Sequence, residues 1–235
     1  MCWRRMPRTI HLQPTAPLAQ RVLLPGDPGR ALLLAQALLS EPKMFNHNRG
    51  LWGYSGAALL DDEPLTIQST GMGGPSAAIV IAELAELGAA TVLRVGTCGG
   101  LDEALELGEL LVVSEAVCED GTSRALQDAP CVSPDPDLLA RVREAGSARA
   151  GSVVSTDLFY DTPPGTEERW RDEGAMAVEM EAATLFALAA RRQLQAGALL
   201  IVTDLLFPTR QRIEPERLHE AEHRLGELAV AALAV

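Results

Sequence analysis

The stretch ATVLRVGTCGGL, residues 90–101, decides how this 235-residue chain is organised. Residues 91–95 are apolar and β-branched apart from Arg94, and the glycine-rich residues 96–100 follow at once. This pattern predicts a buried strand that ends in a glycine-rich loop. Because an unpaired buried guanidinium is strongly unfavourable, Arg94 is expected to meet an anion near the carboxyl end of the strand. That anion is either a structural Asp or Glu, or a ligand bound by the loop N–H groups and the Thr97 hydroxyl.

Strands and helices alternate on both sides of this stretch. Strands are predicted at residues 21–24, 44–48, 51–60, 64–69, 108–117, 151–155, 175–178 and 198–203. Helices are predicted at residues 31–39, 75–87, 138–145, 179–192 and 215–234, and residues 119–136 are predicted to be a long loop. The alternation is typical of an α/β fold, and no linker divides the chain, so residues 1–235 are expected to form one domain.

Composition and charge exclude several classes of partner. The formal net charge of −12 argues against nucleic acid or an anionic membrane, because both would repel the protein. No apolar run approaches the roughly 18 residues of a membrane span, and no signal-peptide core follows the N-terminus, so a cytoplasmic protein is expected. The four cysteines are widely spaced, which favours neither a zinc site nor a disulfide framework.

Two further arginines lie at predicted turns. PGDPGR, residues 25–30, joins a strand to a helix, and such a turn directs backbone N–H groups towards an anion. Arg30 would assist there, although Asp27 as a helix cap beside a solvated Arg30 is the alternative. Arg49, at the turn after residues 44–48, is by default a solvated turn residue.

Three other strand ends carry side chains of interest. Phe159 follows the strand predicted at residues 151–155. Its ring either packs in the core or offers a face on which a flat ring of a ligand stacks. Glu179 and Glu181 begin a helix, where they suit the helix dipole or bind a ligand at the carboxyl edge of the sheet. Asp204 ends a strand and precedes the apolar residues 205–207, surroundings that favour its protonated form.

Four segments taken in order resemble the nucleoside phosphorylase family of trimeric and hexameric enzymes. They are PGDPGR at 25–30, RVGTCGGL at 94–101, VEMEAATLF at 178–186 and the strand that ends in Asp204. The similarity extends from about residue 11 to the end of the chain. It implies a phosphorylase/hydrolase-like fold with a mixed twisted central sheet flanked by helices. It also implies a homo-oligomer, with a dimer as the minimal active unit and a hexamer as the expected assembly.

The resemblance also assigns roles, which are carried over here as expectations. Phosphate would contact Gly26, Arg30, Arg94 and Thr97, with Arg49 from a neighbouring subunit. Ribose would contact Met180 and Glu181, with His11 of the neighbour, which lies in the N-terminal lead 1–19. The base would lie against Phe159, Val178 and Glu179, and Asp204 assisted by Arg217 would protonate a purine. The resemblance implies inorganic phosphate as co-substrate and requires no metal or organic cofactor.

The sequence contains features of two branches of this family that differ in the base. Asp204, Arg217 and the DLFY context of Phe159 favour purine nucleosides. GMGGPS at 71–76, EDGTS at 119–123 and EAATL at 181–185 are more similar to uridine phosphorylases, although Thr166 stands where that branch has glutamine. A nucleosidase that uses water and a non-catalytic nucleoside-binding protein are further alternatives.

Overall fold

The computed structural model describes residues 9–146 and 148–234, and strand β5 (Thr91–Gly100) lies at the centre of its sheet. This strand pairs with β1 (Arg21–Leu24), β10 (Gln195–Leu205) and the short β9 (Ala177–Glu179). The other strands are β2 (Leu39–Asn46), β3 (Gly53–Ala58), β4 (Pro64–Gln68), β6 (Leu110–Cys118), β7 (Cys131–Val132), β8 (Arg149–Ser155) and β11 (Gln211–Arg212). Together they form one sheet of 11 strands in the described residues.

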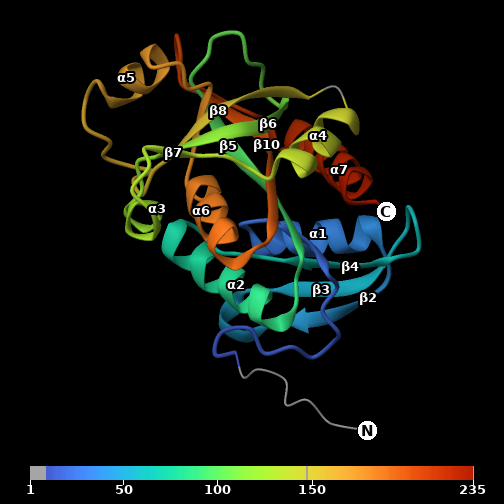
Figure 1. Cartoon of the computed structure of the whole chain (residues 1–235). Coiled ribbons are helices and arrows are strands. Elements are labelled where there is room, and N and C mark those ends of the chain that lie inside the picture. The colour runs from blue at the N-terminus through green and yellow to red at the C-terminus, as the bar shows by residue number, and fades with distance from the viewer. Residues whose placement is uncertain (1–8, 147, 235) are drawn as a thin grey trace, which may run out of the picture.

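One half of this sheet closes on itself. Strands follow the order β10, β6, β8, β9, β5, and β5 pairs again with β10, so these five form a closed ring. Strands β1, β4, β3 and β2 extend from β5 as an open sheet (Figure 1). Because β4, β1, β5 and β10 are mutually parallel, their carboxyl ends lie at one edge. The prediction of a mixed central sheet flanked by helices is confirmed.

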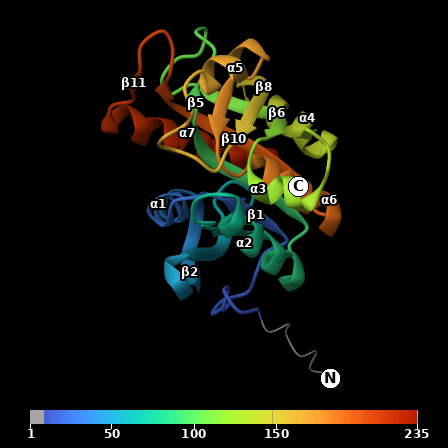
Figure 2. The ribbon, with the colours of Figure 1, turned by 90° about the vertical axis from the view of Figure 1, so that its left-hand side faces the viewer.

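Helices cover both faces of the sheet and bury two apolar cores (Figure 2). On one face pack α1 (Pro28–Leu38), α4 (Pro136–Glu144) and α7 (Pro215–Leu233), which contribute Leu34, Leu138 and Leu225 to one core. On the other face pack α2 (Gly74–Leu87), α3 (Gly121–Leu126) and α6 (Ala182–Arg192), with Phe186 of α6 in the second core. The short α5 (Thr166–Asp172) lies beyond the ends of the strands, and η1 (Asn48–Gly50) is a 3-10 turn.

The predicted glycine-rich loop is wrong, because residues 96–100 continue strand β5. Glycine is needed there for room. A Cβ atom on Gly96 would lie 2.7 Å from Cζ of Arg94, whose guanidinium folds back over this residue. A Cβ atom on Gly99 would lie 2.6 Å from a methyl group of Leu206. Gly96 and Gly99 therefore leave room for the side chains of Arg94 and Leu206 against strand β5.

Other boundaries also differ from the prediction. The expected loop at 119–136 contains α3 and β7, because the Asp120 carboxylate caps α3 by accepting the backbone N–H of Ser123 at 2.8 Å. Helix α5 and strand β11 were not expected, and α6 begins at Ala182 instead of residue 179. Cys98, Cys118 and Cys131 are free thiols, while Cys2 and the first eight residues of the predicted lead lie outside the described residues. Within the described part of the chain, no helix has the length and apolarity needed to cross a membrane.

Candidate functional site

A cavity of about 600 Å³ opens at the carboxyl edge of the parallel strands. Strand pairing explains why distant segments meet there. Leu24 pairs with Arg94, so the turn at residues 25–30 leaves the sheet beside that arginine. Gly99 pairs with both Asp204 and Val178, which brings the ends of β10 and β9 to the same edge. Of the predicted site residues, Gly26, Arg30, Arg49, Arg94, Thr97, Phe159, Val178, Glu179, Met180, Glu181 and Asp204 line this cavity.

Arg30 and Arg49 provide two of the cavity's cations. Arg30 lies in the first turn of α1, which Asp27 caps by accepting the Gly29 N–H at 2.8 Å. The Arg30 Nε donates to Oε1 of Glu222 at 2.7 Å, and both side chains are about nine-tenths buried. Arg49 has a left-handed backbone with φ of 58° and lines the cavity of its own chain, and its expected role towards a neighbouring subunit stays a prediction. Asp27 therefore does cap α1, and Arg30 is not solvated.

Arg94 is buried and meets two carboxylates. Its Nε lies 3.0 Å from Oε2 of Glu179, and its Nη2 lies 2.5 Å from Oε2 of Glu181. Burial by itself lowers the pKa of Arg94, but the charges of Glu181 and Glu179 raise it above the ordinary value, so the guanidinium stays charged. Within the protein, the anions that Arg94 meets are therefore structural carboxylates, as one of the two alternatives predicted. Arg94 also lines the cavity.

Glu179 and Glu181 have different surroundings. The Glu179 carboxylate accepts the backbone N–H groups of Glu181 at 2.9 Å and Ala182 at 3.0 Å, so it caps α6. Glu181 accepts the backbone N–H of Gly73 at 2.6 Å. Burial raises the pKa of Glu181, and Arg94 opposes that shift. Glu179 thus accepts backbone N–H groups at the start of α6, whereas Glu181 contacts Arg94 and the Gly73 N–H where it lines the cavity.

Asp204 lines the cavity near the carboxyl end of β10, where it pairs with Gly99 of β5. Its Oδ2 accepts the Thr203 hydroxyl at 3.0 Å, and its Oδ1 lies 4.0 Å from Nε of Arg212. The expected apolar surroundings are present only in part, since Leu206 lines the cavity but a hydroxyl and a guanidinium also approach the carboxylate. The nearby Cys98 thiol is no nucleophile, because burial raises its pKa and keeps it protonated.

Two predicted residues lie elsewhere. The expected pairing of Arg217 with Asp204 is not observed, because Arg217 Nη2 donates to the backbone carbonyl of Leu107 at 2.7 Å and the residue does not line the cavity. From the first turn of α7, the Arg217 side chain reaches Leu107, in the segment before β6, instead of Asp204. His11 is also outside the cavity, with Nδ1 2.7 Å from Oε1 of Glu83. The expectation that His11 serves a neighbouring subunit stays a prediction.

Several lining residues were missed by sequence reasoning. They are mostly in segments without a predicted element and include Glu167, Trp170, Leu206 and Arg210. Phe159 lines the cavity with 55% of its surface exposed and meets Tyr160 edge to face, so it is not a core residue.

Glu222, the partner of Arg30, could have been recognised from the sequence. It stands in the apolar stripe of α7 with Leu225, and an acid in such a stripe indicates a buried cationic partner.

The arrangement combines three chemical capacities in one cavity. Arg30, Arg49 and Arg94 among its lining residues can bind a dianion. A buried carboxylate on Glu181 can accept from hydroxyl groups, and Asp204 can exchange a proton with a heterocycle that lies against Phe159. This set suits the cleavage or formation of a bond between a sugar and a base, with an oxyanion as the other reactant.

Comparison with known proteins identifies the family of the chain. The chain is 39% identical over 197 residues to a protein named guanosine phosphorylase from Halorubrum lacusprofundi, covering 81% of this chain and 80% of that protein. It is 35% identical over 236 residues to a DeoD-type purine nucleoside phosphorylase from Jannaschia sp., covering 95% and 98%. A third relative, named likewise, from Exiguobacterium sp., is 34% identical over 208 residues, covering 85% and 87%. Because the model of the phosphorylase superfamily also matches residues 20–234, the chain belongs to that superfamily.

Proposed function

We propose that this protein is a purine nucleoside phosphorylase, which converts a purine (deoxy)ribonucleoside and inorganic phosphate into the free base and (deoxy)ribose 1-phosphate. The observation that carries the proposal is that arginines, a buried carboxylate and Asp204 line a single cavity. Arg30, Arg49 and Arg94 supply cations, Asp204 supplies an acid on another strand, and Glu181 is available to the sugar. The names of the relatives favour purine over the uridine alternative.

In the proposed reaction, the bond between ribose C1′ and the purine nitrogen breaks and a bond from C1′ to a phosphate oxygen forms. Phosphate held by the arginines stabilises the oxocarbenium-like sugar and then captures it. Asp204 acts as the general acid that gives a proton to a ring nitrogen, so the base departs neutral. Ionised Glu181 accepts from ribose hydroxyls and holds C1′ over the phosphate. The proposed mechanism uses no metal or organic cofactor.

Phosphate dependence separates this proposal from a nucleosidase. We expect guanosine and inosine to be cleaved only when inorganic phosphate is added, because Arg30, Arg49 and Arg94 of the cavity can bind a dianion that a hydrolase does not use. The measurement is release of free base with and without phosphate, with uridine and adenosine assayed in parallel. Cleavage at the same rate without phosphate would contradict phosphorolysis, and uridine as the best substrate would contradict the purine assignment.

We also propose that the active unit is at least a dimer. Large apolar side chains are exposed on or beside α2, with Ile10 74%, Met72 84% and Ile79 40% exposed. Apolar groups exposed in this way are a sign of an association surface. His11 lies beside them, paired with Glu83 of α2, which suits its expected role towards a neighbour. A hexamer remains the expectation from family resemblance.

Association predicts a loss of activity on dilution. Light scattering gives the protein concentration below which the dimer dissociates. Specific activity should fall when the protein is diluted below that concentration. Met72→Lys is not suitable as a probe, because Met72 lines the cavity. Ile79→Lys on α2 is suitable, since it places a charge on the exposed surface outside the cavity. A fully active monomer of the wild-type protein or of this variant would contradict the proposal.

A further inference from the structure

The ion pair between Arg30 and Glu222 joins the cavity to α7, a helix with no residue in the cavity lining. Glu222 lies on α7, and Arg30 lies 192 positions earlier, on α1. Their side chains are 11% and 10% exposed, and the Nε to Oε1 distance is 2.7 Å. A contact this short between two buried charged groups is a charge-assisted hydrogen bond and is stronger than a neutral one.

The geometry of the contact leaves the outer end of the arginine available. Glu222 engages Nε only, and among the described residues neither Nη atom of Arg30 has a hydrogen-bond partner. Arg30 lines the cavity, whereas Glu222 does not. The Glu222 carboxylate therefore binds the Nε edge of the Arg30 guanidinium, and the two Nη groups remain as donors for a ligand. A guanidinium presents its donors as a rigid planar fork, so one anchored edge orients the other.

We propose that Glu222 is a positioning residue for phosphate, acting through Arg30; the inference rests on the proposed phosphorolysis. A free arginine side chain loses considerable rotamer entropy when it is immobilised on a ligand. The Glu222 carboxylate imposes that order before phosphate arrives. Its negative charge also weakens the attraction of Arg30 for an anion, so the two effects oppose one another. Orientation dominates in the proposal, because Glu222 engages Nε outside the cavity lining and leaves both Nη groups of Arg30 as donors for phosphate.

The test compares Glu222→Ala with Glu222→Gln. In the alanine variant, the KM for inorganic phosphate should rise about tenfold, the effect of losing one charge-assisted contact. At saturating phosphate, kcat should change little, because Glu222 touches no reacting atom. The glutamine variant keeps an acceptor for Arg30 Nε and should recover most of the affinity. Phosphate binding to each protein, measured by calorimetry and as the phosphate-induced rise in Tm, gives a readout independent of turnover.

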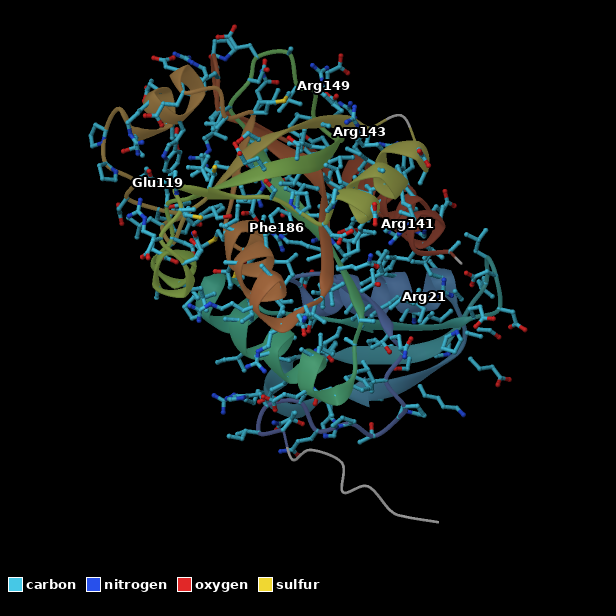
Figure 3. All side chains as sticks on the ribbon, in the orientation of Figure 1. Arg21, Glu119, Arg141, Arg143, Arg149 and Phe186 are labelled. Carbon is cyan, nitrogen blue, oxygen red and sulfur yellow. The ribbon has the colours of Figure 1, made fainter. Side chains whose placement is uncertain are left out.

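Asp61→Ala is the matched control. Asp61 pairs with the buried Arg21 at 2.6 Å, and neither residue lines the cavity. Figure 3 shows Arg21 on the side of the molecule away from α5, which contributes Glu167 to the cavity. This variant loses an ion pair of similar burial, so its Tm should fall while its KM for phosphate stays at the wild-type value.

The outcomes distinguish the inference from the function on which it rests. An unchanged or lowered KM for phosphate in Glu222→Ala, with phosphorolysis intact in the wild type, overturns only the positioning role. A lowered value would show that the charge of Glu222 competes with phosphate. A wild-type protein that neither binds phosphate nor needs it for cleavage overturns the inference and the proposed function together.

Discussion

Asp204→Asn is expected to lower kcat for inosine and guanosine by about 10²- to 10⁴-fold, the usual contribution of a general acid, with a smaller change in KM. Asparagine keeps the size of the side chain and its contact with the Thr203 hydroxyl, but it cannot release a proton in the same way. The measurement is steady-state phosphorolysis of both nucleosides at saturating phosphate. The large effect belongs to kcat because the proton moves in the transition state.

A methylated substrate makes this prediction specific. In 7-methylguanosine the base already carries a positive charge, so its departure needs no proton from the protein. The loss in Asp204→Asn should therefore be much smaller with 7-methylguanosine than with guanosine. Asp172→Asn, at an acid on α5 that does not line the cavity, should leave both substrates unaffected. An equal loss for the two nucleosides would show that Asp204 has a role other than proton donation.

Arg94→Ala should both weaken phosphate binding and destabilise the protein. The variant removes a buried cation that lines the cavity, so we expect the KM for phosphate to rise by on the order of 100-fold. It also leaves the carboxylates of Glu179 and Glu181 without their guanidinium partner, which we expect to lower the free energy of unfolding by about 3–5 kcal/mol. Phosphate titration of the rate and thermal unfolding measure the two effects.

A double variant separates these effects. Arg94→Ala with Glu181→Gln removes one of the two uncompensated buried charges, so part of the stability should return while the KM for phosphate stays high. Arg149→Ala removes an arginine of β8 whose side chain is 41% exposed and paired with Glu109, and it should change neither quantity appreciably. If Arg94→Ala lost stability and kept its wild-type phosphate KM, Arg94 would be a structural residue only.

Much of the fold and of the candidate site could be predicted from local sequence. Apolar runs marked β1, β5, β8 and β10, and the turn after β1 was correctly joined to a helix. These segments are short-range patterns of burial and turn chemistry, which adjacent residues specify. Parallel strands align their carboxyl ends, so residues just beyond Leu24, Arg94 and Val202 were bound to approach one another once the strands were recognised.

The boundaries of helices and strands were harder to predict where tertiary packing overrides the local preference of the residues. Glycines at 96–100 look like a loop in isolation, yet they continue β5 because Leu206 and the Arg94 guanidinium occupy the space that side chains would fill. Helix α3, within the expected loop, depends on the Asp120 cap, and Asp120 in turn accepts the Thr184 hydroxyl of α6 at 2.9 Å. Contacts of this kind come from another part of the chain.

Local residue patterns were enough to predict an α/β chain with arginines and carboxylates at the ends of its strands. Which of these charged groups pair with one another depends on the folded arrangement of the chain. Arg94 pairs with Glu179 across 85 positions and Arg30 with Glu222 across 192, while Arg217 contacts a backbone carbonyl instead of Asp204. The physical reason is that a charged side chain selects its partner by burial and distance in space, and neither quantity is encoded in the residues next to it.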